Sequence, residues 1–302
     1  MECNNDNPRS RSRADDVAAT ALGRAPTDGD LLSNGPAKPR GKRRKTGWIV
    51  GGCIFLVLAA LGLVRIRRQA DAANRYAEHR VAAHGLFGKG QFKQAAWHFQ
   101  QMVALEPELS EGHYGLGTAF TNLRDANAID FYREAIRLRP DYGLAYGNLG
   151  VELMRVGRLP EAIGALAKAL EVGGQTAAGH SNLGQAMGMS HDFEGAMREY
   201  RLAIKIDPNN VGAQYNLGTL LLTLKQAPAA LPHLKCAVAL APNNSSARMN
   251  LAIAMLSAGD EAGAQAQLEL LVRLDPRDAQ AREALAALRA SRTPASQAAT
   301  KP

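Results

Sequence analysis

Cysteine and aromatic residues are both scarce in this 302-residue sequence. The three cysteines, Cys3, Cys53 and Cys236, give no pair that can be argued to form a disulfide, and no Cys/His spacing matches a metal site. Aromatic residues make up only 5% of the chain and few runs resemble strands, whereas Ala, Gly and Leu dominate. We therefore expect an all-α protein that uses no metal and no cofactor.

Motifs that carry known catalytic chemistry are also missing. There is no Gly-x-x-x-x-Gly-Lys-Ser/Thr phosphate loop, no Gly-x-Ser-x-Gly and no His-Glu-x-x-His. The histidines are scattered, and His98, His180 and His233 fall in helical patterns, where packing or surface roles are expected. The glycine-rich stretch 85–90 follows no strand, so we interpret it as a helix terminator. We expect the protein not to be an enzyme.

The net charge of +8 does not belong to one basic face. Residues 1–46 contribute a net +4, and Arg65, Arg67 and Arg68 add +3. From Gln69 onward the chain has 23 basic and 22 acidic residues, so its two signs nearly balance. Because nucleic-acid binding needs a concentrated basic surface, we expect no nucleic-acid partner.

One long apolar run lies between two basic stretches. Residues 47–64, GWIVGGCIFLVLAALGLV, carry no charge and approach the length of about 20 residues that crosses a bilayer. Trp48 stands at one end, where indole favours the membrane interface. The flanking sequences KPRGKRRK and RIRR argue against a buried core helix, and the long preceding segment argues against a cleaved signal peptide. We therefore expect a single transmembrane helix at 47–64.

The flanking charges also predict an orientation. Six positive charges precede the apolar run closely and three follow it, so the N-terminus should be cytoplasmic and the rest of the chain on the opposite side, periplasmic in a bacterium. Gly47-x-x-x-Gly51 would let two such helices approach closely, which makes a weak homodimer conceivable. Residues 1–46 are polar, without apolar periodicity, and we expect them to be disordered.

The remainder of the chain is periodic. Prolines recur at intervals of 33, 68, 34 and 34 residues, at Pro107, Pro140, Pro208, Pro242 and Pro276. A period in this range indicates a solenoid of stacked supersecondary units. Inside each unit, apolar residues at spacings of three and four predict two helices, and the turn between them is often marked by glycine.

This pattern resembles the tetratricopeptide repeat family, which stacks helix–turn–helix units. The family's Leu-Gly pair in the first helix is matched at Leu116-Gly117, Leu149-Gly150, Leu183-Gly184 and Leu217-Gly218. Its small residue early in the second helix is matched at Ala95, Ala128, Ala162, Ala196, Ala230 and Ala264.

The resemblance implies a right-handed superhelix of about six repeats over residues 69–290. Phased on the closing proline, the repeats are 76–109, 110–142, 143–176, 177–210, 211–244 and 245–278. Residues 279–290 are expected to form a capping helix that gives the solenoid a polar end, and residues 291–302 a flexible tail.

Four asparagines recur every 34 residues, and we call them the asparagine ladder. They are Asn148, Asn182, Asn216 and Asn250. Each is one position, about 100° of helix rotation, away from the apolar seam of its first helix. In the family's architecture the first helices line the concave surface, so the ladder would follow the inner groove. The ladder is similar to that in the repeat domain of O-linked N-acetylglucosamine transferases, where such asparagines grip an extended polypeptide backbone. The catalytic domain of those transferases has no counterpart here.

The amide chemistry agrees with this resemblance, because one amide offers two donors and one acceptor to a peptide unit. An alternative is that the asparagines only satisfy hydrogen bonds between packed helices. One position before or three after a ladder residue lie the other expected groove residues: Ser181, Gln185, Tyr215, Thr219, Met249 and Ile253. They form no charge cluster, so the groove should suit an extended, fairly neutral segment.

Two functions follow as hypotheses. The first is a membrane-anchored scaffold whose concave groove binds an extended segment of a partner protein. The second is a non-catalytic subunit that docks an enzyme or export complex through its convex face, in which case the ladder is structural.

Overall fold

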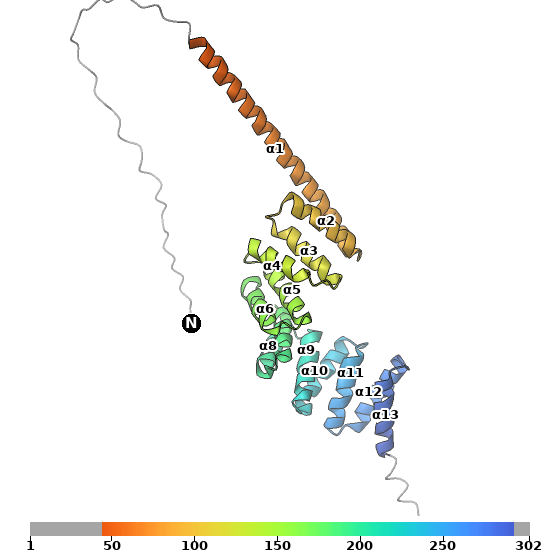
Figure 1. The fold of residues 1–302 in the computed structure, drawn as a ribbon. Coiled ribbons are helices and arrows are strands. Elements are labelled where there is room, and N and C mark those ends of the chain that lie inside the picture. Colours follow the sequence, from red (N-terminus) through yellow and green to blue (C-terminus); the bar gives the residue numbers. More distant parts are fainter. Residues whose placement is uncertain (1–43, 293–302) are drawn as a thin grey trace, which may run out of the picture. The chain divides into compact units, whose positions relative to one another are not determined.

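The computed structural model describes the backbone of residues 44–292 and the side chains of residues 58–291 (Figure 1). Within this range the chain forms thirteen helices and no strand, which confirms the all-α prediction. Contacts divide the chain into two compact units, residues 1–61 and 62–302. The second unit contains every helix after α1 and holds the repeats.

The helices follow one another with short connections. Their bounds are Arg44–Gly88 (α1), Phe92–Leu105 (α2), Ser110–Asn122 (α3), Ala128–Leu138 (α4), Gly143–Arg155 (α5), Leu159–Gly173 (α6), Ala177–Met189 (α7), Phe193–Ile206 (α8), Val211–Thr223 (α9), Ala227–Leu240 (α10), Ser245–Ser257 (α11), Glu261–Leu274 (α12) and Ala279–Arg292 (α13). The helices α3, α5, α7, α9 and α11 begin at the first residues of the repeats expected from the sequence.

The expected membrane location requires a correction. Among the residues that the structure describes in full, no helix is both long and apolar enough to cross a bilayer. This finding overturns the prediction of a single-pass membrane protein with the repeats on the far side. The side chains of residues 47–57, with Gly47 and Gly51 of the expected homodimer contact, lie outside the described side chains. So do most of the 1–46 segment and residues 293–302.

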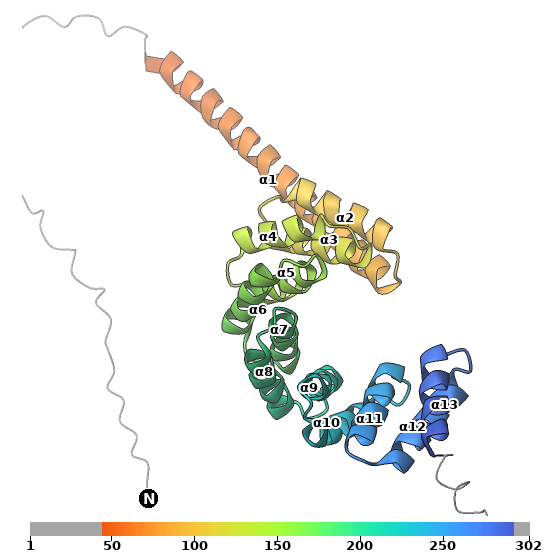
Figure 2. The same cartoon turned by 60° about the horizontal axis from the view of Figure 1, so that its bottom comes forward.

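Within residues 62–292 the helix pairs follow one another along a curved path (Figure 2). Figure 2 shows α5, α7, α9 and α11 on the inner side of this curve and α6, α8 and α10 on its outer side. Each helix from α2 to α12 packs against the next one in the chain. This arrangement is that of a helix–turn–helix solenoid, in which each unit contacts mainly its neighbours.

Each turn between the two helices of a repeat is closed by the same backbone motif. One residue adopts a left-handed conformation, with φ between 57° and 84°, at Gly90, Arg124, Gly157, His191, Lys225 and Gly259. In the third repeat, Gly157 N–H donates to Met154 O over 3.0 Å and Arg158 N–H donates to Leu153 O over 2.9 Å. These two bonds form a Schellman motif, which satisfies carbonyls that the end of a helix leaves without partners.

The two helices of a repeat approach each other at a residue that has no Cβ. A Cβ at Gly150 would lie 2.5 Å from Leu166 Cγ, and one at Gly218 would lie 2.6 Å from Leu234 Cγ. At Gly117 the added atom would meet the ring of Tyr132, also at 2.6 Å. The family's Leu-Gly pair therefore has a direct steric explanation, because any larger residue would push the two helices apart.

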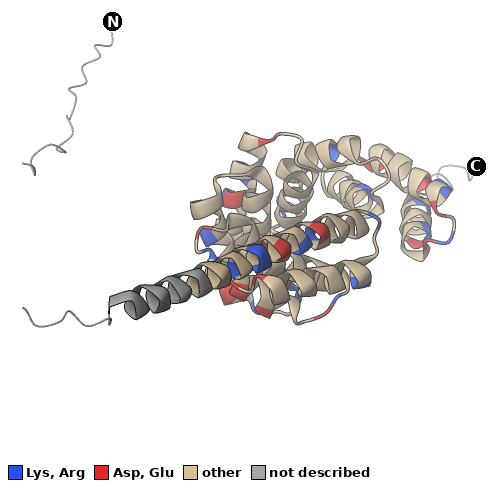
Figure 3. Ribbon diagram, turned by 90° about the horizontal axis from the view of Figure 1, so that it is seen from above, with Lys and Arg blue, Asp and Glu red and all other residues tan. Residues whose placement is uncertain are grey.

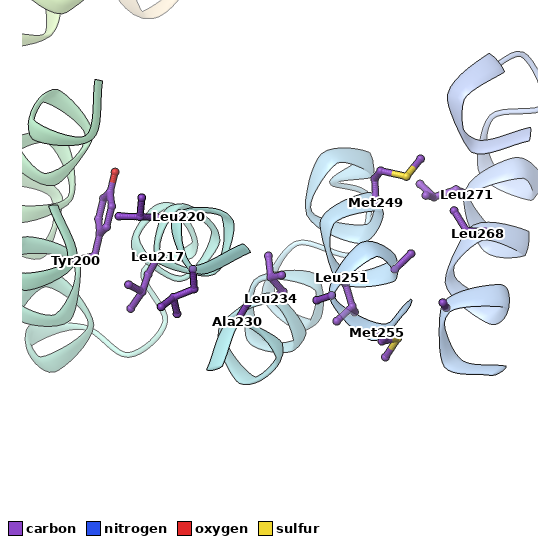
Figure 4. Close-up of a cluster of buried hydrophobic side chains, with 14 of the residues drawn as sticks. Tyr200, Leu217, Leu220, Ala230, Leu234, Met249, Leu251, Met255, Leu268 and Leu271 are labelled. Atoms are coloured by element: carbon purple, nitrogen blue, oxygen red, sulfur yellow. The ribbon is translucent and has the colours of Figure 1, made fainter. Parts of the chain in front are cut away.

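The apolar seam continues from repeat to repeat without interruption. Leucines 17 residues apart come from four successive helices, α9 to α12, at Leu217, Leu234, Leu251 and Leu268 (Figure 4). Each is at most 2% exposed. Burial of one leucine side chain contributes about 1.5–3 kcal/mol, so this row is a main source of stability in the C-terminal repeats.

We predict that Gly150→Val destabilises the chain by at least about 1–3 kcal/mol, because the new side chain overlaps Leu166 in a packed core. The matched control is Gly164→Ala in α6, where an added Cβ meets nothing within 4 Å. Alanine is the better helix former, so the control should raise stability by up to about 1 kcal/mol. Urea unfolding followed by circular dichroism measures both changes. Equal midpoints for Gly150→Val and the parent chain would contradict the packing described.

A second prediction concerns the left-handed turn residues. Lys225 has a φ of 60°, which costs a side-chain-bearing residue roughly 1 kcal/mol. Lys225→Gly should therefore raise the unfolding midpoint, although glycine's greater freedom in the unfolded chain offsets part of the gain. The reciprocal change Gly157→Ala, at a φ of 78°, should lower it. The same sign for both changes would show that turn conformation does not limit stability.

Candidate functional site

The asparagine ladder lies on the four inner helices α5, α7, α9 and α11. All four asparagine side chains are half-buried, while the leucine that follows each of them is at most 7% exposed. The ladder residues thus lie at the edge of the apolar seam. From this position an amide can contact either a neighbouring repeat or a molecule held against the inner face.

Two ladder residues bond to the preceding repeat. Asn148 Nδ2 donates to the hydroxyl of Tyr114 on α3 over 3.1 Å. Asn250 Nδ2 donates to the hydroxyl of Thr219 on α9 over 2.9 Å. At these two positions the ladder connects successive first helices, so the structural alternative accounts for one donor of each amide.

Tyrosines beneath the ladder remain neutral hydroxyls at physiological pH. Burial raises the pKa of Tyr114, and the hydrogen bond with Asn148 lowers it by a smaller amount. Burial likewise raises the pKa of Tyr200 to about 12, against the opposing effect of a hydrogen bond with Asn216. Each hydroxyl therefore keeps its proton and accepts a hydrogen bond from an asparagine without becoming charged.

Asn182 differs from these residues. Within the described part of the chain, its amide has no hydrogen-bond partner. It lines a cavity of about 410 Å³ that also reaches Asn148. The cavity opens between α5 and α7, and it is bordered by Gly143, Gly147, Gly173, Gly174 and Gly179. Because these residues lack side chains, the backbone of a bound molecule can come close to both amides.

The cavity is nearly neutral. Its charged lining residues are Arg139 and Asp141, whose Nε and Oδ1 atoms lie 3.7 Å apart. The Arg139 guanidinium also lies 3.6 Å from the ring centroid of Tyr142. Elsewhere on the repeats, Lys and Arg are interspersed with Asp and Glu, and Figure 3 shows no face given to one sign. The lining therefore offers amides, backbone groups and apolar surface.

A second cavity, of about 260 Å³, meets the first at Asn148. It lies between α3 and α5 and has a polar lining with contributions from α1 and α4. The lining residues are Phe87, Thr118, Thr121, Asn122, Tyr132, Asn148, Val151 and Glu152. Asn148 thus belongs to two consecutive hollows along the inner helices.

The other residues expected in the groove differ in accessibility. Ser181 and Met249 are buried, at 8% and 9% exposure, and so offer little surface to a ligand. Gln185 and Ile253 are exposed, and Tyr215 and Thr219 are half-buried. The buried pair was expected on the wrong face because the inner helices also pack against their neighbours one step from the ladder.

A buried polar column was not foreseen from the sequence. It replaces an early aromatic residue of the repeat pattern with His180, Gln214 and Arg248, which are 5–6% exposed. Each bonds to a polar side chain 19 residues later: Glu199, His233 and Gln267, over 2.7–2.8 Å. The only signal in the sequence was this second column of polar residues, and the histidines were instead assigned to general packing or surface roles.

His180 also connects the column to the first cavity. Its Nε2 lies 2.7 Å from Gln175 Oε1, and Gln175 Nε2 donates to Leu170 O over 3.1 Å. Gln175 lies between Gly174 and Thr176, and both of these line the cavity. The buried histidine thus fixes the connection from α6 to α7 at the rim of the site.

Family models match three parts of the chain. A model described as "Tetratricopeptide repeat" matches residues 221–288 and another with the same description matches residues 80–143. A model described as "TPR repeat" matches residues 192–225. Together these matches span more than half of the chain.

Similar proteins contain the same repeats. The chain is 28% identical to the Hsp70-Hsp90 organizing protein of Triticum aestivum over 112 residues, which are 37% of this chain and 19% of that protein. It is 30% identical over 87 residues to serine/threonine-protein phosphatase 5 of Rattus norvegicus, covering 29% of this chain and 17% of that protein. The chain thus matches less than a fifth of the length of these two relatives.

A solved structure described as PilW, a widely conserved type IV pilus biogenesis factor, shares the fold. Its TM-score is 0.64 at 16% identity, covering 70% of this chain and 98% of that one. The helical solenoid, the recurring Leu-Gly contact and the matched family models agree, and the chain belongs to the tetratricopeptide repeat family.

Proposed function

We propose that this repeat protein is a non-catalytic scaffold that holds an extended segment of a partner protein along its inner helices. The carrying observation is Asn182, an amide without a partner in the described chain, at a cavity that it shares with Asn148. A half-buried amide that no protein group satisfies gains free energy when a ligand supplies its hydrogen bonds. Tetratricopeptide repeats in the named relatives support a role in protein interaction.

The chemistry of the site favours a peptide backbone as the ligand. An asparagine amide donates to a peptide carbonyl and accepts from a peptide N–H, without regard to the side chains. The glycine border permits close approach, and the neutral lining requires no charge on the ligand. The likeness of the ladder to that of O-linked N-acetylglucosamine transferases supports the same mode of binding.

The position of the ladder favours more than one point of contact. Asn216 and Asn250 continue the row on α9 and α11 after Asn148 and Asn182 on α5 and α7. The oxygens of Asn148 and Asn250 are not the atoms that bond to Tyr114 and Thr219, so both amides retain acceptor capacity. Several modest contacts along an extended chain add up to useful affinity while each one stays weak.

A specific observation favours the outer face as a second candidate. Trp97 of α2 is 52% exposed and lines a cavity of about 500 Å³ with Phe120 and Leu123 of the next repeat. Exposed tryptophan beside a hollow is typical of residues that dominate protein interfaces. In this alternative the partner docks at Trp97 and the ladder only joins the repeats.

The test compares Asn182→Ala with Asn243→Ala in the full chain. Asn243 is an exposed residue of the turn before α11 and lies outside both inner cavities. A displayed random peptide library is selected on the parent chain, and the affinities of the enriched peptides are measured for both variants. Asn182→Ala should weaken binding about five- to tenfold, which corresponds to about 1–1.4 kcal/mol for the lost amide hydrogen bonds.

Stability serves as the control for this comparison. Asn182 has no partner to lose, so its change should leave the urea midpoint within about 0.5 kcal/mol of the parent. Undiminished peptide binding by Asn182→Ala would remove the ladder from the function. A partner protein that is lost only with Trp97→Ala would establish the outer face instead.

A further inference from the structure

We propose that the cavity beside Asn148 is a specificity pocket for a basic side chain, lysine or arginine, of the bound segment, with Glu152 as the residue that selects it. This inference rests on the proposed function and adds the chemical class of one ligand side chain. It starts from a departure in the repeat pattern. The tenth residue of a repeat is Ala119, Ala186, Leu220 and Ala254 in four of the other repeats, all buried.

In the third repeat this position holds Glu152, whose side chain is 2% exposed. Burial of a carboxylate costs several kcal/mol unless partners compensate it. Glu152 Oε2 accepts from Arg155 Nε over 2.8 Å, one turn later on the same helix. Arg155 is 37% exposed and is not among the residues that line the cavity, whereas Glu152 is. The ion pair thus engages one carboxylate oxygen from outside the pocket.

The donors around the cavity are already used within the protein. Asn122 Nδ2 donates to Thr118 O over 2.8 Å, and the Thr118 hydroxyl donates to Gly115 O over 2.8 Å. The hydroxyls of Thr121 and Tyr132 bond to each other over 3.0 Å. With Asn148 Nδ2 directed to Tyr114, the lining has spent most of its N–H and O–H groups on internal bonds.

What remains is mostly acceptor capacity. The carboxylate of Glu152 and the amide oxygens of Asn122 and Asn148 offer lone pairs around one polar hollow. A ligand group made of donors and carrying positive charge complements this lining, and ammonium and guanidinium groups are such groups. A carboxylate or phosphate would meet the Glu152 charge without a free donor, so an acidic ligand is disfavoured.

The pocket is also placed correctly for a side chain of the proposed ligand. Asn148 borders both this cavity and the larger one that contains Asn182. A backbone held at Asn148 therefore has the pocket directly at hand for one side chain. The ladder would provide affinity that is independent of sequence, and Glu152 would choose the residue at one position.

The first measurement uses small probes on the full chain. n-Butylguanidinium chloride is titrated while the side-chain amide signals of Asn122 and Asn148 are followed by nuclear magnetic resonance, at constant ionic strength. n-Butylurea, which has nearly the same shape without the charge, is the paired probe. Saturable shifts are expected with the guanidinium, and about tenfold weaker ones with the urea or with Glu152→Gln, since a charge-assisted bond is lost.

Two comparisons guard against indirect effects. Glutamine at 152 can still accept from Arg155, so the fold should persist and an unchanged circular dichroism spectrum checks this. Glu171→Gln removes an exposed carboxylate on α6, paired with Lys168 over 2.7 Å, and should leave the guanidinium response unchanged. An equal response in the parent and Glu152→Gln would overturn the proposal.

The second measurement uses peptides selected on the parent chain. One position should be enriched in Arg or Lys, and its replacement by citrulline should weaken binding about tenfold to the parent but little to Glu152→Gln. Peptides that depend on Asn182 but show no such position would leave the scaffold function standing and refute the pocket. If no peptide is selected, the scaffold proposal fails, and the guanidinium titration alone decides the pocket.

Discussion

The contact between the two helices of a repeat, made at a residue without a Cβ, is the constraint on which the remaining structure depends. At Gly117, Gly150, Gly184 and Gly218 an added carbon would lie 2.5–2.9 Å from the side chain that packs there. Backbone therefore packs directly against side chain, which brings the second helix close and buries its leucine or tyrosine. Once this distance is set, each first helix turns one face to its partner and leaves the next face toward the inner side.

The connection between repeats depends on polar groups to an unusual degree. Aromatic residues are few, and the place of one recurring aromatic is taken by His180, Gln214 and Arg248 in buried hydrogen bonds. Such bonds are costly to break because the buried groups are left unsatisfied. They specify which helices pair, while the apolar seam supplies the larger part of the stabilising free energy.

The third repeat departs most from the regular pattern, and the two inner cavities meet there. It ends in Gly173-Gly174 where other repeats have a proline, and Gly143 approaches Gly173 so closely that a Cβ there would lie 2.5 Å from the Gly173 Cα. It also carries Glu152 at a position that other repeats fill with apolar residues. Irregularity in a repeat costs stability locally, and a binding function is one reason for a chain to retain it.

The sequence alone determined the helical class, the phase of the repeats and the identity of the ladder, because all three follow from periods that one chain displays. Helix periodicity and proline spacing are local properties, and local properties are readable without coordinates. It did not determine which asparagines already have partners. Asn148 reaches Tyr114, 34 residues away, whereas Asn182 reaches nothing in the described chain, and the same amide gave no sign of the difference.

Only the tertiary structure decided that Ser181 and Met249 are buried, that His180 joins Glu199 and Gln175, and that Glu152 lines a cavity. Each of these facts depends on how neighbouring helices cross, and the crossing is set by contacts between residues far apart in the chain. A repeat sequence states which residues are equivalent. Their surroundings are made by the neighbouring repeats, and those differ from one unit to the next.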